Sequence, residues 1–69
     1  MTVNIGVIGV GLMGRFHALT LSRKVDGARL IGVADSNRRV AEQVASETHT
    51  TAYDDYAKLL ENKDLDAVV

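Results

Sequence analysis

Three glycines near the start of the chain have a spacing that suits phosphate binding. Residues 9–14 read GVGLMG, which is the pattern G-x-G-x-x-G. In such a pattern Gly9 permits a tight turn, Gly11 leaves room for a diphosphate beside the backbone, and Gly14 lets a helix pack closely on a strand. A helix that begins here presents free N–H groups and a positive dipole end to an anion. Because glycines gather in many loops, the pattern alone is weak, and its surroundings must decide its meaning.

A carboxylate follows the glycines at an informative distance. Asp35 closes an apolar run at 30–34 and lies 21 residues after Gly14 (35 − 14 = 21). A separation of about 20 residues is typical of an acid that accepts hydrogen bonds from the adenosine ribose of a dinucleotide. Together the two features predict dinucleotide binding rather than a structural glycine loop. In that site Leu12 and Met13 contribute the backbone of the loop.

The same acid bears on which dinucleotide is bound. A carboxylate at Asp35 repels the 2′-phosphate of NADP and bonds well to the free hydroxyls of NAD, so NAD is the expected cofactor. Arg38 and Arg39 leave NADP open, because a guanidinium one turn away is able to clamp that phosphate. Their alternative is a solvated helix face, which we prefer, and Arg38 is kept as a candidate cofactor-binding residue.

Other chemistries find less support. Arg15 and Phe16 stand where a P-loop has its lysine and magnesium-binding hydroxyl, which argues against nucleotide hydrolysis. His17 is expected to pack or cap rather than to act as a general base, and His49 to be an exposed side chain. The pair Asp54-Asp55 is typical of a helix start. With two histidines and no cysteine, neither a metal cage nor a disulfide is expected.

Composition narrows the classes of partner. The chain has 69 residues with a net charge of −1, two Tyr, one Phe and no Trp, so neither a basic stripe nor a stacking platform for nucleic acid is present. No apolar run reaches the roughly 18 residues that a membrane span needs. The lack of cysteine fits an intracellular protein, and we expect a cytoplasmic one. Because the edge of the expected fourth strand and part of a sheet face would be exposed, we expect self-association or a homo-oligomer.

The elements that must position these residues alternate between strand and helix. Apolar β-branched runs predict strands, and apolar residues at helical spacing predict helices. The expected elements are a strand at 3–8, a helix from Leu12 to about Lys24, a turn at Asp26-Gly27, a strand at 30–34, a helix capped by Ser36 or Asn37, a short strand at 48–52, a helix capped by Asp54 and a strand at 66–69.

Apolar residues recur at helical intervals within each expected helix. They are Leu12, Phe16 and Leu19 in the first, Val40, Ala41, Val44 and Ala45 in the second, and Tyr56, Leu59 and Leu60, expected to face inward, in the third. Alternation of strand and helix specifies an α/β fold with a parallel sheet. Right-handed crossovers then predict the strand order 3-2-1-4, with two helices on one face and the third on the other. The expected fold is a partial Rossmann domain over residues 1–69.

Several blocks of the chain resemble a known family. The patterns G-x-G-x-x-G-x-x-H at 9–17, V-A-D at 33–35 and Y-x-D-Y-x-x-L-L at 53–60 occur in that order. They are similar to the N-terminus of the Gfo/Idh/MocA oxidoreductases, the glucose-fructose oxidoreductase and inositol dehydrogenase family, over nearly the whole chain. The resemblance implies a sugar or polyol dehydrogenase that moves hydride to or from NAD(P). It also assigns Gly9, Gly11, Gly14 and Asp35 to cofactor binding.

The departures from the family pattern matter as well. The family's Glu-Lys-Pro block and its later catalytic Asp and His have no match in this sequence, and the glycine usual after the second helix is absent near 48–50. We therefore expect the cofactor-binding part of a longer enzyme, without a substrate domain and inactive alone. A complete, non-catalytic nucleotide-binding module remains the alternative.

Overall fold

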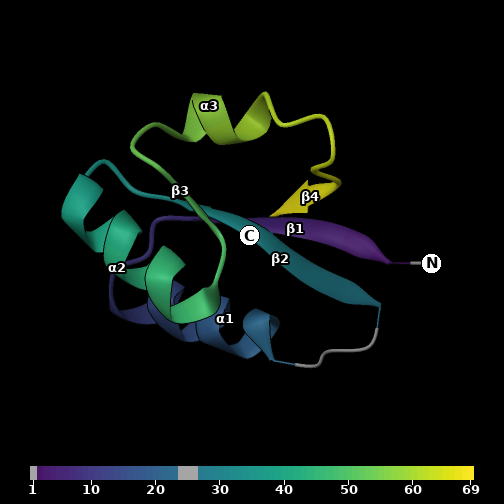
Figure 1. Ribbon diagram of the computed structural model, residues 1–69, viewed down its shortest axis with the longest axis horizontal. Helices are drawn as coiled ribbons and strands as arrows, with labels where there is room; N and C mark the ends of the chain where they lie inside the picture. The colour runs from purple at the N-terminus through teal and green to yellow at the C-terminus, as the bar shows by residue number, and fades with distance from the viewer. Residues whose placement is uncertain (1, 24–26) are drawn as a thin grey trace.

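The chain folds into one parallel sheet with helices on both of its faces (Figure 1). The computed structural model describes residues 2–23 and 27–69. Its elements are β1 (Val3–Ile8), α1 (Leu12–Ser22), β2 (Ala28–Ala34), α2 (Arg38–Thr48), β3 (Thr51–Tyr53), α3 (Tyr56–Leu60) and β4 (Ala67–Val68). The strand order is β3-β2-β1-β4, which confirms the predicted order. The predicted helix end at Lys24 and the turn residue Asp26 lie outside the described residues.

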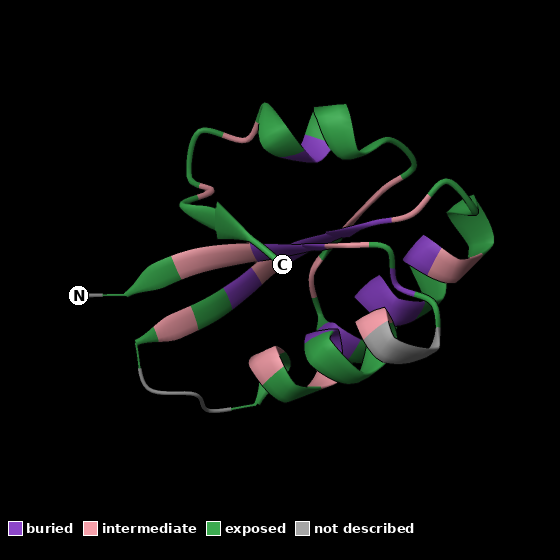
Figure 2. Cartoon of the chain, turned by 180° about the vertical axis from the view of Figure 1, so that it is seen from behind, coloured by how far each residue is buried: buried purple, intermediate pink, exposed green. Residues whose placement is uncertain are grey.

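The main core lies between the sheet and the pair of helices below it in Figure 1. Helices α1 and α2 cover one face and α3 covers the other, as predicted, and the buried residues lie along the sheet and the inner sides of the helices (Figures 1 and 2). Val7 and Val33 are register partners on β1 and β2, and each is at most 1% exposed. Val44 of α2 packs in the same cluster. This core holds the ends of β1 and β2 side by side.

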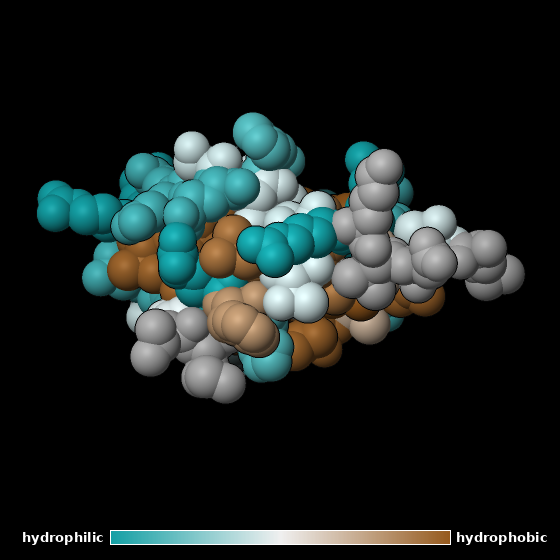
Figure 3. Space-filling view, turned by 90° about the horizontal axis from the view of Figure 1, so that it is seen from below, coloured by the Kyte–Doolittle hydropathy of each residue, from teal (hydrophilic) through white to brown (hydrophobic). Residues whose placement is uncertain are grey.

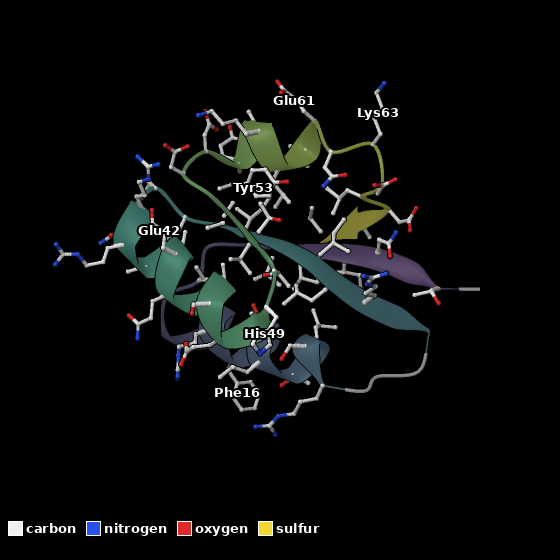
Figure 4. All side chains as sticks on the ribbon, in the orientation of Figure 1. Phe16, Glu42, His49, Tyr53, Glu61 and Lys63 are labelled. Carbon is white, nitrogen blue, oxygen red and sulfur yellow. The ribbon has the colours of Figure 1, made fainter. Side chains whose placement is uncertain are left out.

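Helix α1 packs on the sheet through small residues. Gly14, Ala18 and Leu21 share one side of the helix at intervals of four and three residues, and Ala18 is fully buried. Phe16 is 64% exposed and points away from the sheet (Figure 4). The spacing of Phe16 was helical, but it belongs to the outer side, because the close approach at Gly14 sets which side faces inward.

Helix α3 touches the opposite face of the sheet at one side chain. Leu59 is fully buried against Gly6 and Gly32, which are register partners on β1 and β2. A Cβ at Gly6 would lie 2.9 Å from a methyl of Leu59, and one at Gly32 would lie 3.0 Å from its other methyl. Tyr56 and Leu60 are 60% and 51% exposed, so the prediction that both face inward was wrong. Because α3 has only five residues, it buries one side chain, Leu59, against the two glycines.

The start of α3 also differs from the prediction. Asp55, rather than Asp54, is the N-cap, and its side chain accepts a hydrogen bond of 2.8 Å from the N–H of Ala57. Asp54 instead accepts a hydrogen bond of 3.1 Å from Nζ of Lys58. The two neighbouring carboxylates therefore have separate structural roles. At the start of α2, Asn37 is the cap, one of the two predicted residues.

The end of α2 extends beyond the predicted boundary. Thr48 is the last residue of the helix, so β3 begins three residues later than the expected strand. His49 then adopts the left-handed conformation, with φ 56° and ψ 44°. The N–H of Thr50 donates to the carbonyl of Ala45 at 3.0 Å, which is the closing bond of a Schellman motif. His49 thus takes the place usually held by glycine, and its side chain is exposed as predicted.

Strand β4 is short but firmly attached to β1. The N–H of Asn4 donates to Oδ2 of Asp66 at 2.7 Å, and the N–H of Asp66 donates back to the carbonyl of Asn4 at 2.8 Å. The N–H of Val69 donates to the carbonyl of Gly6 at 3.0 Å.

Across the described ranges, no helix is long and apolar enough to span a membrane.

Candidate functional site

The first and last glycines of the 9–14 segment bring the end of β1 into direct contact with α1. Gly9 has φ +81°, which a residue with a side chain rarely adopts, and its N–H donates to the carbonyl of Ala34 at 2.8 Å. A Cβ on Gly14 would lie 1.6 Å from the carbonyl oxygen of Gly9. Both positions therefore require glycine, as the sequence predicted from their spacing.

Gly11 serves a different purpose, because it leaves space open. It is the N-cap of α1, and in the described part of the structure a Cβ there would meet no atom within 4 Å. The backbone of Leu12 and Met13 forms the first helical residues, and their side chains lie outside what is described. N–H groups of a first helical turn have no partner within the helix, so they are available to an anion. The space beside Gly11 is where such an anion has room.

Asp35 is held in place by backbone donors from two segments. Its Oδ2 accepts the N–H of Val10 at 3.0 Å, and its Oδ1 accepts the N–H of Asn37 at 2.8 Å. Its own N–H donates to the carbonyl of Tyr53 at 3.1 Å. Each carboxylate oxygen keeps a further lone pair, so two acceptor sites remain for a diol. The bond from Val10 ties the glycine segment to the end of β2.

A cavity of about 440 Å³ lies at the carboxyl ends of β1, β2 and β3. Its volume is within the range of roughly 300–1,000 Å³ that is usual for small-molecule sites. The lining comes from three successive strand ends: Ile8, Gly9, Ala34, Asp35, Ser36, Asp54, Asp55 and Tyr56. The structure thus brings Gly9 and Asp35 to one cavity, as predicted. The contribution of 54–56 was missed, since it depends on the pairing of β2 with β3.

The electrostatics of this cavity are dominated by carboxylates. Asp35, Asp54 and Asp55 all line it. The hydrogen bond from Lys58, together with its charge, lowers the pKa of Asp54, so this carboxyl stays ionised to a lower pH than usual. Such a lining favours ligand groups that are neutral or that donate hydrogen bonds, and disfavours a phosphate.

The two arginines after Asp35 lie apart from this lining. Nε of Arg38 donates to Oε1 of Glu42 at 3.1 Å, and the Arg38 side chain is 75% exposed. Arg38 lines a second cavity of about 240 Å³, which has Asp54 in common with the first. Arg39 is exposed. The structure therefore places Arg38 on a solvated helix side beside the candidate site, and its role with a cofactor remains a prediction.

Neither histidine lines these cavities. His17 is exposed, and its ring meets that of Phe16 edge-on, with centroids 6.3 Å apart and planes inclined by 73°. His49 lies at the far end of α2 (Figure 4). Among residues 2–23 and 27–69, no cluster of three His, Asp or Glu side chains is arranged to hold a metal ion.

One ion pair was not found by sequence reasoning. Nε and Nη2 of Arg15 donate to the two carboxylate oxygens of Glu47 at 2.9 and 2.5 Å, a bidentate arrangement. The hydrogen bonds raise the pKa of Arg15, and the same bonds lower the pKa of Glu47. Because Arg15 follows Gly14 directly, the pair links the first turn of α1 to the last turn of α2. Residues 32 positions apart carry no local pattern that predicts such a contact.

Known proteins resemble this chain in both sequence and fold. The model of an oxidoreductase family with an NAD-binding Rossmann fold, GFO_IDH_MocA, matches residues 3–69. The chain belongs to the Gfo/Idh/MocA family. The family's fold agrees with the observed sheet and with the predicted fold class, so the resemblance inferred from the sequence is confirmed.

Inositol dehydrogenases are among the proteins that this chain is similar to in sequence. The inositol 2-dehydrogenase/D-chiro-inositol 3-dehydrogenase of Lacticaseibacillus casei is 40% identical over 99% of this chain and 20% of its own length. Inositol 2-dehydrogenase 2 of Saccharopolyspora erythraea is 43% identical over 100% of this chain and 21% of its own. The chain thus spans about a fifth of the curated relatives that it matches.

Solved structures of family members superpose closely. Myo-inositol dehydrogenase from Lactobacillus casei, solved with NAD(H) and myo-inositol, has a TM-score of 0.86 and 40% identity over 99% of this chain and 21% of its own. UDP-N-acetylglucosamine 3-dehydrogenase GnnA from Acidithiobacillus ferrooxidans has a TM-score of 0.82 and 38% identity over 99% of this chain and 21% of its own. The family therefore includes members whose names specify different substrates.

Proposed function

We propose that this chain is the cofactor-binding part of an oxidoreductase that transfers hydride between NAD and a polyol or sugar of the inositol class. The substrate class rests on the names of the relatives, which are inositol dehydrogenases of 40% and 43% identity. Bound NAD would supply the hydride acceptor or donor. The substrate-binding and proton-transferring groups would belong to the rest of a longer protein, so this chain alone binds and does not catalyse.

The observation that carries the proposal is the position of Asp35. Its two oxygens are oriented by Val10 and Asn37, and it lines one cavity with Gly9. The start of α1 beside Gly11 is the place for the diphosphate, and the remaining lone pairs of Asp35 suit the ribose hydroxyls. The residues present therefore fit a dinucleotide.

A preference for NAD over NADP follows from charge. A 2′-phosphate on the ribose would lie beside Asp35, in a cavity that Asp54 and Asp55 also line. Arg38, the candidate clamp, already pairs with Glu42. Because Glu42 offsets part of the Arg38 charge, Arg38 would attract a 2′-phosphate less strongly than an unpaired arginine would.

Calorimetric titration tests the proposal. We expect the chain to bind NAD and ADP-ribose, with NADP at least tenfold weaker. Gly11→Val should abolish binding of all three, because the new side chain fills the space for the diphosphate while φ −67° tolerates it. Thr51→Val is the matched control: it adds a valine at an exposed position of β3, outside both cavities, and should bind as the original chain does.

Two results would count against the proposal. Failure of the original chain to bind any of the three ligands would remove the nucleotide-binding function. Equal affinity of Gly11→Val and the original chain would show that nucleotide binds somewhere other than the start of α1.

We also infer that the chain associates with copies of itself. The sheet ends in the edge strands β3 and β4, and apolar side chains of β4 and of the residue after it are exposed.

A further inference from the structure

Tyr56 combines exposure with a place in the Asp35 cavity. It is 60% exposed, although it is a large aromatic residue at the start of a helix. Within the described lining of the cavity it is the one aromatic side chain. Leu60, one turn further along α3, is exposed to a similar degree but does not line the cavity. Exposure and contact with the cavity therefore coincide at Tyr56.

The backbone around Tyr56 is fixed relative to Asp35. The N–H of Asp35 donates to the carbonyl of Tyr53, the last residue of β3. Asp55, the N-cap, accepts the N–H of Ala57 and so sets where α3 begins. A short, hydrogen-bonded stretch of chain thus connects Tyr56 to the backbone of Asp35, at the side of the cavity formed by the start of α3.

The order of groups in a dinucleotide indicates what lies there. If the diphosphate lies at Gly11 and the adenosine ribose at Asp35, the base lies on the other side of the ribose from the diphosphate. Apart from the ends of β1 and β2 and the residues directly after them, the lining consists of Asp54, Asp55 and Tyr56. Adenine is uncharged, so these carboxylates do not repel it as they would a phosphate, and its faces and edges suit an aromatic ring and hydrogen-bond acceptors.

We propose that Tyr56 is an adenine-binding residue of this site, with its ring stacked on the base. The inference rests on the proposed dinucleotide function and assigns one further residue to it. Tyrosine suits the position, because its ring offers an apolar face to the base while its hydroxyl stays in water. Stacking on the base also explains why an aromatic side chain is found at a position where it is not buried in the protein.

Binding measurements with two ligands test the stacking. Tyr56→Ala should weaken ADP about tenfold, since stacking on an aromatic side chain contributes on this order per base. It should leave ribose 5-phosphate, which has no base, unchanged. Leu60→Ala is the matched control, because it removes a similarly exposed side chain of α3 outside the cavity. We expect its affinity for both ligands to equal that of the original chain.

Tyrosine fluorescence gives a second, independent readout. The chain has two Tyr and no Trp, so Tyr53→Phe leaves Tyr56 as the single strong fluorophore, and Tyr56→Phe leaves Tyr53. ADP should quench the emission of Tyr53→Phe and affect Tyr56→Phe much less. Absorption of light by ADP is the same in both samples, so the difference between them reports stacking.

The outcomes separate this inference from the proposed function. Binding of ADP that is equally tight in Tyr56→Ala and the original chain, with no selective quenching of Tyr56, would overturn the stacking and leave the nucleotide site intact. Absence of ADP binding to the original chain would overturn the function itself. An equal loss of ADP and ribose 5-phosphate would show that Tyr56 supports the fold of the site and would also overturn stacking.

Discussion

Among the described residues, His49 is the one residue other than glycine with a positive φ, a backbone conformation that residues with a side chain rarely adopt. A side chain in this conformation costs roughly 1–2 kcal/mol, and glycine avoids that cost at the expense of some unfolded-state entropy. The Schellman bond from Thr50 to Ala45 holds the conformation in place. The turn after α2 therefore has a histidine at a position where glycine is usual, and His49 bears the strain.

Replacing His49 should therefore stabilise the chain. We expect His49→Gly to raise the free energy of unfolding by about 0.5–1 kcal/mol, because the left-handed conformation no longer opposes a Cβ. Urea unfolding followed by circular dichroism measures the change. Ser46→Gly is the control: Ser46 lies exposed inside α2, where replacing serine by glycine should cost about 0.5 kcal/mol. A loss of stability in both variants would contradict this account of His49.

Residues differ in how far their roles could be predicted from the sequence. The spacing of Gly9, Gly14 and Asp35 was informative, because each role follows from local chain geometry, and the structure gives the two glycines the expected contacts. The bond from Val10 to Asp35 was not predictable, since a backbone N–H is the same for every residue type. The place of Tyr56 depended on how β3 pairs with β2, which helical spacing does not report.

At the scale of elements, α3 shows how a short helix can depend on one contact. Leu59 rests on the surface formed by Gly6 and Gly32, two glycines that face each other across β1 and β2. A helix of five residues has little stability of its own, so this packing must hold it. The type of element was predictable from apolar spacing. Its inward side was not, because that required the register that pairs the two glycines.

Truncation of Leu59 should be far more costly than truncation of its neighbour. Leu59→Ala removes a fully buried side chain, and we expect a loss of about 2–5 kcal/mol in the free energy of unfolding. Leu60→Ala removes one that is 51% exposed and should change it by less than about 0.5 kcal/mol. Guanidinium unfolding of the two variants compares them directly. Similar losses would mean that α3 does not pack through Leu59.

At the scale of the whole molecule, the strand order was predictable because right-handed crossovers leave few choices once the alternation of elements is known. The extent of each strand was not predictable, and β4 pairs over only two residues.

The outer sides of α1 and α2 present hydrophilic side chains interleaved with apolar ones (Figure 3). At β4, Val68 and the following Val69 are 42% and 57% exposed beside an edge of the sheet. Exposed apolar residues on an open edge favour pairing with another chain.

Light scattering over a range of concentrations tests this association. We expect the average mass to rise with concentration for the original chain and to stay near 7.4 kDa for Val68→Lys, because a lysine on an edge strand opposes pairing with a second edge. Thr51→Lys puts the same charge on β3, the opposite edge, and should associate as the original chain does. If the two lysine variants behave alike, association does not use the β4 edge. A constant mass of the original chain at every concentration would show that the molecule is a monomer despite its exposed valines.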